Sequence, residues 1–223
     1  MRFLLQKISA GSPAVPRVAP FLIFLVFTAC QGKFGPASAC WFYLAKTLVG
    51  AWLVWEMRPL VLEMRWAFSW EAIAAGVGVL VMWIGIDQFY PHLSKTGATG
   101  NPNLVFGEHS PLAWFFILAH ILGMTLVVPP LEEVFYRSFL YRYLASQNFL
   151  SIPLNRFAPL PFWATALVFG FSHNEWLAGI LCGAAYQWVV IRKNRLGDAM
   201  TAHAITNFLL GVWIVWRGAW HFW

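Results

Sequence analysis

Long apolar runs, separated by short joints that carry charge, proline or glycine, dominate this sequence. Hydrophobic residues make up 60% of its 223 positions and charged residues 11%. Soluble globular domains are about half apolar and about a quarter charged. Such a chain would expose a large apolar surface in water, so a lipid bilayer is its natural solvent. The 14 Trp agree, because indole rings favour the membrane–water boundary.

The runs predict an all-α protein, a polytopic transmembrane bundle of about seven or eight helices. Several runs are shorter than the roughly 20 residues that a perpendicular span needs. The segment 131–150 is expected to form a further helix that either spans or re-enters the bilayer. A long loop at 91–111 separates an anchor region, 1–110, from a functional region, 111–223. The expected spans cover residues 18–30, 37–55, 70–89, 112–130, 160–173, 176–191 and 198–216.

The net charge of +6 does not indicate a nucleic-acid partner, because the basic residues form no patch. They are scattered between apolar spans, and their bias favours an N-terminus in the cytoplasm. The spacing of the three cysteines suggests neither a disulfide framework nor a zinc site. On the inner side we count Arg2, Lys7, Arg17, Arg58, Arg65, Arg137, Arg142, Arg156, Arg192, Lys193 and Arg195, and on the outer side Lys33, Lys95 and Arg217.

A first polar cluster runs from position 129 to 137. Its proline pair, Pro129 and Pro130, is expected to end one helix and to begin the next. Glu133 and Arg137 are four residues apart, so they share a helix face and can pair. Glu132 points about 100° away from that pair. One carboxylate is therefore expected to be held in an ion pair while its neighbour faces a cavity.

Two further clusters complete an intramembrane polar cavity. His173 follows an apolar helix, and His203 and Asn207 share a helix face at i, i+4. A carboxylate and an imidazole can position a water and take its proton. A second histidine and an amide can donate hydrogen bonds to the oxyanion that forms when water attacks a carbonyl. The set suffices for amide hydrolysis without a covalent nucleophile, a metal or another cofactor.

Each cluster has a plainer explanation when it is taken alone. A Glu-Glu-x-x-x-Arg helix start is usually a capped, salt-bridged terminus, and His203 with Asn207 would serve as interhelical hydrogen bonds. Three clusters in one small membrane region favour a functional site instead, because ionisable residues inside spans are costly. A zinc-dependent metalloprotease with Glu132, His173 and His203 as ligands remains an alternative. A non-catalytic membrane scaffold or immunity protein is another.

The three motifs resemble those of the CAAX protease and bacteriocin-processing family of intramembrane glutamate proteases. They are Glu132-Glu133-x-x-x-Arg137, Phe169-x-x-x-His173 and His203-x-x-x-Asn207, and the resemblance covers about residues 129 to 208. It implies a helical membrane fold and peptide hydrolysis. Glu132 and His173 would activate the water, His203 and Asn207 would form the oxyanion site, and Glu133 with Arg137 would support the geometry. Leu177 departs from the family pattern, which commonly has Asn there.

The chain also resembles a bacterial subgroup of CAAX-protease-related proteins that is associated with exosortase systems. This resemblance implies a multi-pass protein of the bacterial inner (plasma) membrane and a membrane-associated protein or peptide as substrate. Exosortase-system proteins become candidate partners beside the lipid bilayer.

Convergence of the three motifs poses a geometric problem. With seven spans, Glu132 lies near the inner face and His173 near the outer end of its own span. About 13 residues of helix separate the two levels by roughly 20 Å. An eighth span at 131–150 would place the basic residues at 192–195 outside, against the charge bias. We therefore expect helices that are staggered in depth or re-entrant.

Overall fold

The computed structural model describes residues 11–93, 100–108 and 110–223. In these ranges all regular elements are helices, which confirms the predicted all-α bundle of seven or eight helices. Arg2, Lys7 and Lys95, used in the orientation count, lie outside the described residues. The helices are α2 (Val15–Cys30), α3 (Pro36–Met57), α4 (Trp70–Ile86), α5 (Pro102–Phe106), α6 (Pro111–Leu126), α7 (Val128–Glu133), a π-helical segment (Val134–Leu140), α8 (Tyr141–Ala145), α9 (Pro159–Phe171), α10 (Trp176–Lys193) and α11 (Leu196–Arg217).

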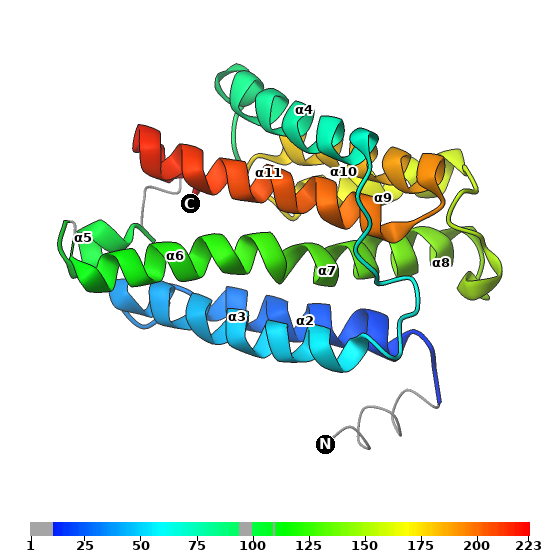
Figure 1. Cartoon of the computed structure of the whole chain (residues 1–223), viewed down its shortest axis with the longest axis horizontal. Coiled ribbons are helices and arrows are strands. Elements are labelled where there is room, and N and C mark those ends of the chain that lie inside the picture. The colour runs from blue at the N-terminus through cyan, green and yellow to red at the C-terminus, as the bar shows by residue number, and fades with distance from the viewer. Residues whose placement is uncertain (1–10, 94–99, 109) are drawn as a thin grey trace.

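One long helix runs through the middle of the bundle (Figure 1). It consists of α6, α7, the π-helical segment and α8, and it extends over 35 residues from Pro111 to Ala145. The helices α2 and α3 pack on one side of it, and α9 and α11 pack on the other. α4 and α10 pack on α11 and complete that second layer. The central helix therefore presents one face to each layer.

Four helices are long and apolar enough to cross a membrane. α2 and α9 are shorter apolar helices. An exposed stripe of Leu118, Leu122 and Leu126 lies on α6 at a spacing of four residues. A stripe of this kind suits contact with lipid tails, because a soluble monomer rarely exposes contiguous apolar patches. The chain is a multi-pass membrane protein whose candidate spans are Pro36–Met57, Trp70–Phe89, Pro111–Ala145 and Leu196–Arg217.

Consecutive helices run in opposite directions, so the connections gather at two ends of the bundle (Figure 1). We call the end with loops 58–69, 146–158 and 194–195 the basic end, and the opposite one the far end. Most described basic residues outside the helix interiors lie at the basic end: Arg58, Arg65, Arg156, Arg192, Lys193 and Arg195, against Lys33 and Arg217 at the far end.

Exposed tryptophans mark both ends of the bundle, as expected for two membrane–water boundaries. Those near the basic end occupy the end of α3, the start of α4, the first turn of α9 and the last turns of α10. Those near the far end occupy the first turns of α3 and α6 and the end of α11. The first group is Trp55, Trp70, Trp163 and Trp188, and the second is Trp41, Trp114 and Trp216.

The proline pair stands where one helix ends and the next begins, as predicted, but the break is a single residue long. Only Val127 separates α6 from α7, and its backbone stays in the right-handed helical region, at φ −103° and ψ −44°. Pro129 and Pro130 then occupy the first turn of α7, where a missing N–H group costs little. A wider break at this depth would leave more backbone groups unpaired in the membrane, where each costs several kcal/mol. The segment 131–150 is thus no separate span, since it begins as a continuation of α6.

A close crossing brings α9 and α10 together. A Cβ built on Gly179 would lie 2.8 Å from the Cα of Gly170, and one built on Gly170 would lie 2.7 Å from the carbonyl oxygen of Trp176. Only glycine permits this approach, which is the usual way in which membrane helices pack tightly. The crossing fixes the turn between the two helices, and His173 lies in that turn.

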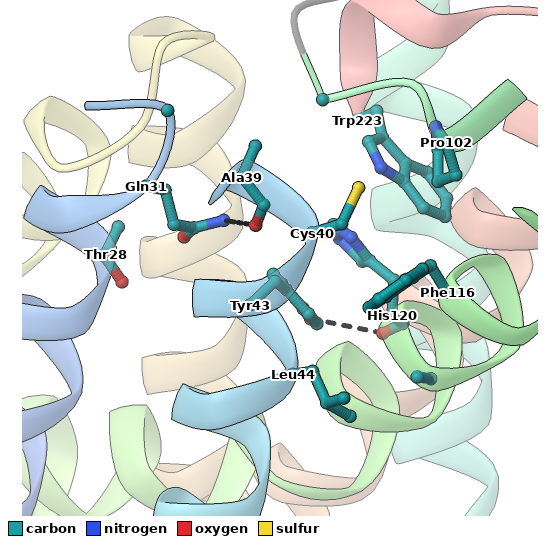
Figure 2. A pocket seen from close by; sticks show the side chains of 13 residues that line it. Thr28, Gln31, Ala39, Cys40, Tyr43, Leu44, Pro102, Phe116, His120 and Trp223 are labelled. Carbon is teal, nitrogen blue, oxygen red and sulfur yellow. Dashed lines mark hydrogen bonds between the residues drawn. The ribbon is translucent and has the colours of Figure 1, made fainter. Parts of the chain in front are cut away.

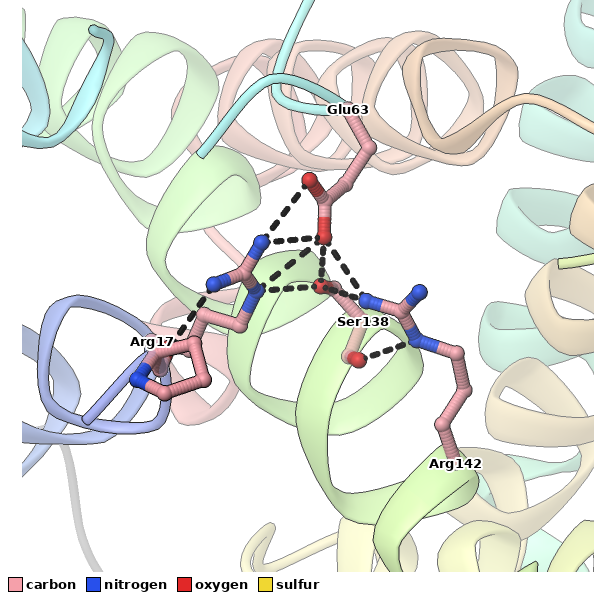
Figure 3. A network of polar contacts seen from close by, with 5 residues as sticks. Arg17, Glu63, Ser138 and Arg142 are labelled. Carbon is pink, nitrogen blue, oxygen red and sulfur yellow. Dashed lines mark hydrogen bonds and ion pairs between the residues drawn. The ribbon is translucent and has the colours of Figure 1, made fainter. Parts of the chain in front are cut away.

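A polar network at the basic end joins three parts of the chain (Figure 3). We call Arg17, Glu63, Ser138 and Arg142 the end network. The Glu63 carboxylate accepts hydrogen bonds from Arg17 Nη2 at 2.8 Å, from Arg142 Nη2 at 2.7 Å and from the Ser138 hydroxyl. It therefore ties α2, loop 58–69 and the end of the central helix together.

Candidate functional site

A cavity of about 180 Å³, here the site cavity, lies inside the bundle between α4, α6, α7, α9, α10 and α11. His173, His203 and Asn207, three of the four predicted catalytic residues, line it. They come from the α9–α10 turn and from two successive turns of α11. The other lining residues include Trp83, Val128, Phe169, Cys182, Tyr186 and Thr206.

A fully buried ionic cluster lies beside the cavity. We call Glu133, Arg137 and His203 the site cluster. Arg137 Nε is 3.1 Å from Glu133 Oε2, and neither side chain is exposed. Glu133 Oε1 accepts a hydrogen bond from His203 Nδ1 at 2.9 Å, because a carboxylate can only accept. The remaining ring nitrogen of His203, Nε2, stays available to the cavity.

The tautomer of His173 follows from its neighbour. Its Nδ1 lies 2.8 Å from the carbonyl oxygen of Phe169, which cannot donate, so Nδ1 carries the proton. In the neutral ring, Nε2 then has a free lone pair and can accept a proton. Trp83 packs edge-on against the ring, with centroids 5.7 Å apart. The ring is thereby oriented as a base at the cavity wall.

Asn207 lies one turn after His203 on the same face of α11. Its Nδ2 donates to the carbonyl oxygen of Met124 at 2.7 Å, which anchors the amide to α6. A second N–H of the same group remains for another acceptor. Tyr186 stacks on His203, with centroids 5.2 Å apart, and donates to Thr206 Oγ1 at 2.6 Å. These contacts hold both polar side chains of α11 in place.

Glu132 is the predicted catalytic residue that is not part of the cavity lining. It lies one helical turn from Val128, which lines the cavity, and one turn from Tyr136. The Tyr136 hydroxyl is 3.2 Å from the Ser172 hydroxyl, beside His173. Glu132 therefore lies on the face of the central helix that carries Val128 and Tyr136, outside the cavity lining itself. Its Oε2 is buried and has no hydrogen-bond partner among the described residues.

The difference in depth that the sequence suggested is largely removed by the long central helix. Tyr141 accepts a hydrogen bond from the Ala158 N–H group at 2.9 Å, so α9 begins level with Tyr141. Along the central helix, Glu132 lies nine residues before Tyr141, which corresponds to about 13 Å toward the far end. The 13 residues of α9 run in the same direction and rise about 20 Å before the turn that carries His173. Glu132 and His173 thus differ in depth by only about 7 Å. Placing Glu132 near the inner face was wrong, because the helix continues to Ala145.

A second, larger cavity of about 370 Å³ lies on the other side of the central helix, toward the far end (Figure 2). The ring of His120 is stacked between Tyr43 and Trp223, with centroids 3.6 and 3.9 Å away. Close by, the buried Lys46 amino group donates to Gln31 Oε1 at 2.8 Å. Lys46 is a buried polar residue that the three motifs did not include.

Lys46, Tyr186 and the end network were missed as parts of the polar interior. For Lys46 the signal was present, since a lysine within an apolar span is itself a reason to expect a function. Tyr186 carried no such signal, because an aromatic residue in an apolar helix is usually only a packing residue. Glu63 lies in a loop far from Ser138 and Arg142 in sequence, so spacing alone did not connect them.

The arrangement combines a candidate base and two candidate hydrogen-bond donors around one cavity, with the carboxylate of Glu132 on the neighbouring helix. Such a set fits hydrolysis of an amide in a low-dielectric site. Glu132, His173 and His203 do not have ligand atoms that all lie within 4.8 Å of one another. A group that does so lies elsewhere among the described residues, at Asp87, His92 and Glu175.

Fold and site together define a polytopic helical membrane protein with a polar cavity between its helices. Residues 113–209 match the family model described as type II CAAX prenyl endopeptidase Rce1-like. The match confirms the resemblance carried by the three motifs: this segment is similar to a family of CAAX peptidases. Comparisons with curated proteins and with solved structures each gave no match.

Proposed function

We propose that the chain is an intramembrane endopeptidase that hydrolyses a peptide bond of a membrane-associated protein or peptide. The observation that carries the proposal is the meeting of His173, His203 and Asn207 at one cavity, with Glu132 on the helix face beside it. The family match supports peptide hydrolysis in general. A protein of the bacterial inner membrane with its basic end in the cytoplasm would fit the positive-inside rule.

In the proposed reaction, Glu132 and His173 position a water between them, and one of them takes its proton. The water oxygen attacks the peptide carbonyl carbon, and Asn207 with His203 Nε2 donates hydrogen bonds to the oxyanion. His203 Nε2 can donate there only when the ring carries a proton on that nitrogen as well, while Nδ1 stays hydrogen-bonded to Glu133. The C–N bond then breaks, and the stored proton passes to the leaving nitrogen. Neither a metal nor another cofactor takes part.

The test uses the full chain purified in detergent and a panel of quenched fluorescent membrane peptides, prenylated and unprenylated. Glu132→Gln should lower kcat/KM by about 10²–10⁴, the usual contribution of a general base. Glu71→Gln is the matched control, since Glu71 is an exposed carboxylate in α4 that pairs with Lys193. Full activity of Glu132→Gln would overturn the assigned mechanism.

Two further outcomes separate the other candidate functions. A zinc-dependent protease that uses the same side chains would lose its activity in chelator, whereas the proposed mechanism is unaffected. A scaffold or immunity protein would cleave no peptide and would keep its partners in Glu132→Gln. An exosortase-system partner stays a prediction, and co-purification from the native membrane would test it.

A further inference from the structure

The end of α4 and the α9–α10 turn meet at the far end of the bundle, outside the site cavity's polar centre. Asp87 follows α4 directly, His92 lies five residues later, and Glu175 ends the turn that carries His173. One ligand atom from each of these three residues lies within 4.8 Å of the others. An imidazole and two carboxylates are a donor set that zinc accepts.

No lysine or arginine among the described residues compensates the two carboxylates of this group. Glu175 is only 9% exposed and accepts a hydrogen bond from Asn174 Nδ2 at 3.4 Å. Asp87 lies near two histidines, with Oδ1 3.0 Å from His92 Nε2 and Oδ2 3.5 Å from His221 Nε2. Two carboxylates at this distance repel each other, and neutral histidine or amide partners do not cancel their charge. A divalent cation would neutralise both.

The geometry around His92 gives a second, independent reason. Its Nε2 is 3.0 Å from Asp87 Oδ1, yet both atoms are buried and neither has a hydrogen-bond partner among the described residues. A simple hydrogen bond would direct the N–H group at the oxygen. Two ligands of one tetrahedral zinc ion need no such alignment, and they lie about 3.3 Å apart when each is about 2.0 Å from the metal.

The neighbouring backbone holds the three residues together before any ion binds. The indole Nε1 of Trp176 donates to the carbonyl oxygen of Pro91 at 2.8 Å. The Leu93 N–H group donates to the carbonyl oxygen of Asn174 at 3.2 Å. These bonds connect the segment after α4 to the turn between His173 and α10, so the ligand set is largely preformed.

We propose that Asp87, His92 and Glu175 bind one zinc ion that fixes the His173 turn to the end of α4. The ion is structural, and it leaves the water-activating groups untouched. Glu175 also lines the site cavity, two residues after His173, so the bound ion would restrict the orientation of that histidine. This site uses none of the residues assigned to the hydrolytic reaction.

Metal binding is measured on the full chain in detergent, without any peptide substrate. After treatment with chelator, the chain should take up one zinc ion per molecule, as counted by elemental analysis. His92→Ala, Asp87→Asn and Glu175→Gln should each weaken zinc binding more than about 100-fold, because even an outer partner of a ligand contributes 10–100-fold. Glu71→Gln, at the opposite end of α4 from Asp87, is the matched control and should bind zinc normally.

Hydrogen–deuterium exchange reports the positioning role. Zinc should slow the exchange of amides 172–177 in the unmodified chain and in Glu132→Gln, and should leave His92→Ala unchanged. Equal zinc uptake by His92→Ala and the unmodified chain would overturn the proposal, and so would tighter binding of calcium or manganese than of zinc. Because the assay needs no cleavage, loss of the proteolytic proposal would leave the result for zinc intact, and the reverse holds as well.

Discussion

The site cluster and the end network contain the same kinds of groups on the same helix, but they differ in how fully those groups are paired. In the end network, Glu63 accepts hydrogen bonds from two arginines and one serine. In the site cluster, Glu133 Oε2 and Arg137 Nε form an ion pair at 3.1 Å without hydrogen-bond geometry, and Arg137 Nη1 has no hydrogen-bond partner among the described residues.

Buried polar groups in native proteins are nearly always hydrogen-bonded, so a cluster of exceptions needs an explanation. In the end network the Glu63 carboxylate is fully hydrogen-bonded, as expected for a group that only connects parts of the fold. The site cluster keeps unused hydrogen-bonding capacity next to a cavity, as expected where another molecule completes it. The two groups contain similar residues and are similarly buried. What distinguishes the candidate site from the structural network is how completely its polar atoms are hydrogen-bonded.

The largest effect is expected from the base at the cavity. His173→Ala should lower kcat/KM by about 10²–10⁴, while the free energy of unfolding changes little, because the ring is partly exposed. Peptide cleavage and a thermal melt on the same preparation measure the two quantities. Ser172→Ala is the neighbouring control and should retain most of the activity. A parallel loss of stability and activity would make His173 a structural residue.

The second prediction compares the stability lost when one arginine is removed from the site cluster or from the end network. Arg137→Ala leaves the Glu133 charge buried beside a single histidine and should cost about 3–5 kcal/mol of stability. Arg142→Ala should cost less, because Glu63 keeps Arg17 and Ser138. Unfolding in denaturant, followed by tryptophan fluorescence, measures both. Equal losses would remove the distinction between the two groups.

The third prediction concerns the oxyanion site. Asn207→Ala should lower kcat about 10²–10³-fold, the usual effect of removing one oxyanion donor, with a smaller change in KM. Asn207→Asp, nearly equal in size, should be no better, since an ionised carboxylate repels the oxyanion. Kinetics over a range of substrate concentrations separate kcat from KM. An effect on KM alone would assign Asn207 to substrate binding.

The smallest effect belongs to the end network and depends on pH. Burial alone would raise the pKa of the Glu63 carboxyl, but the Ser138 hydrogen bond and the Arg17 charge outweigh it and hold this pKa below its usual value. The stabilisation is thus complete above the unfolded pKa, about 4.3, and is lost as pH falls through the folded value. Glu63→Gln should cost about 1.5–3 kcal/mol at pH 7 and should flatten the loss of stability in acid. Thermal melts from pH 7 to pH 3 provide the measurement, and an unchanged acid profile in Glu63→Gln would contradict the prediction.

The helical membrane fold could be predicted because apolar runs report burial in lipid whatever the helices pack against. The depth of Glu132 could not be predicted, because a proline pair looks the same in the sequence whether the helix axis continues past it or not. The spacing of Glu133 and Arg137 placed them on one face, whereas the hydrogen bond between Glu133 and His203 depends on how α11 packs. The boundary at residue 110 and the roles of the site residues stay predictions.

The group of Asp87, His92 and Glu175 was beyond prediction for a related reason. Asp87 and Glu175 lie 88 positions apart in the sequence, and only the packing of the α9–α10 turn against the end of α4 brings them together. His92 lies in the long loop and showed no regular spacing to either carboxylate. Local spacing detects ligands on one helix, but it does not detect ligands that tertiary packing collects.

The unequal lengths of the helices have a consequence for the surrounding lipid. The central helix of 35 residues is about 50 Å long, whereas α9 with 13 residues is about 20 Å long. A hydrocarbon layer about 30 Å thick matches neither, so it is compressed beside α9 and the longer helix tilts or protrudes. The deformation of the bilayer around the protein therefore depends on the length of the lipid acyl chains. Short-chain lipids relieve the compression beside the turn that carries His173, and long-chain lipids increase it.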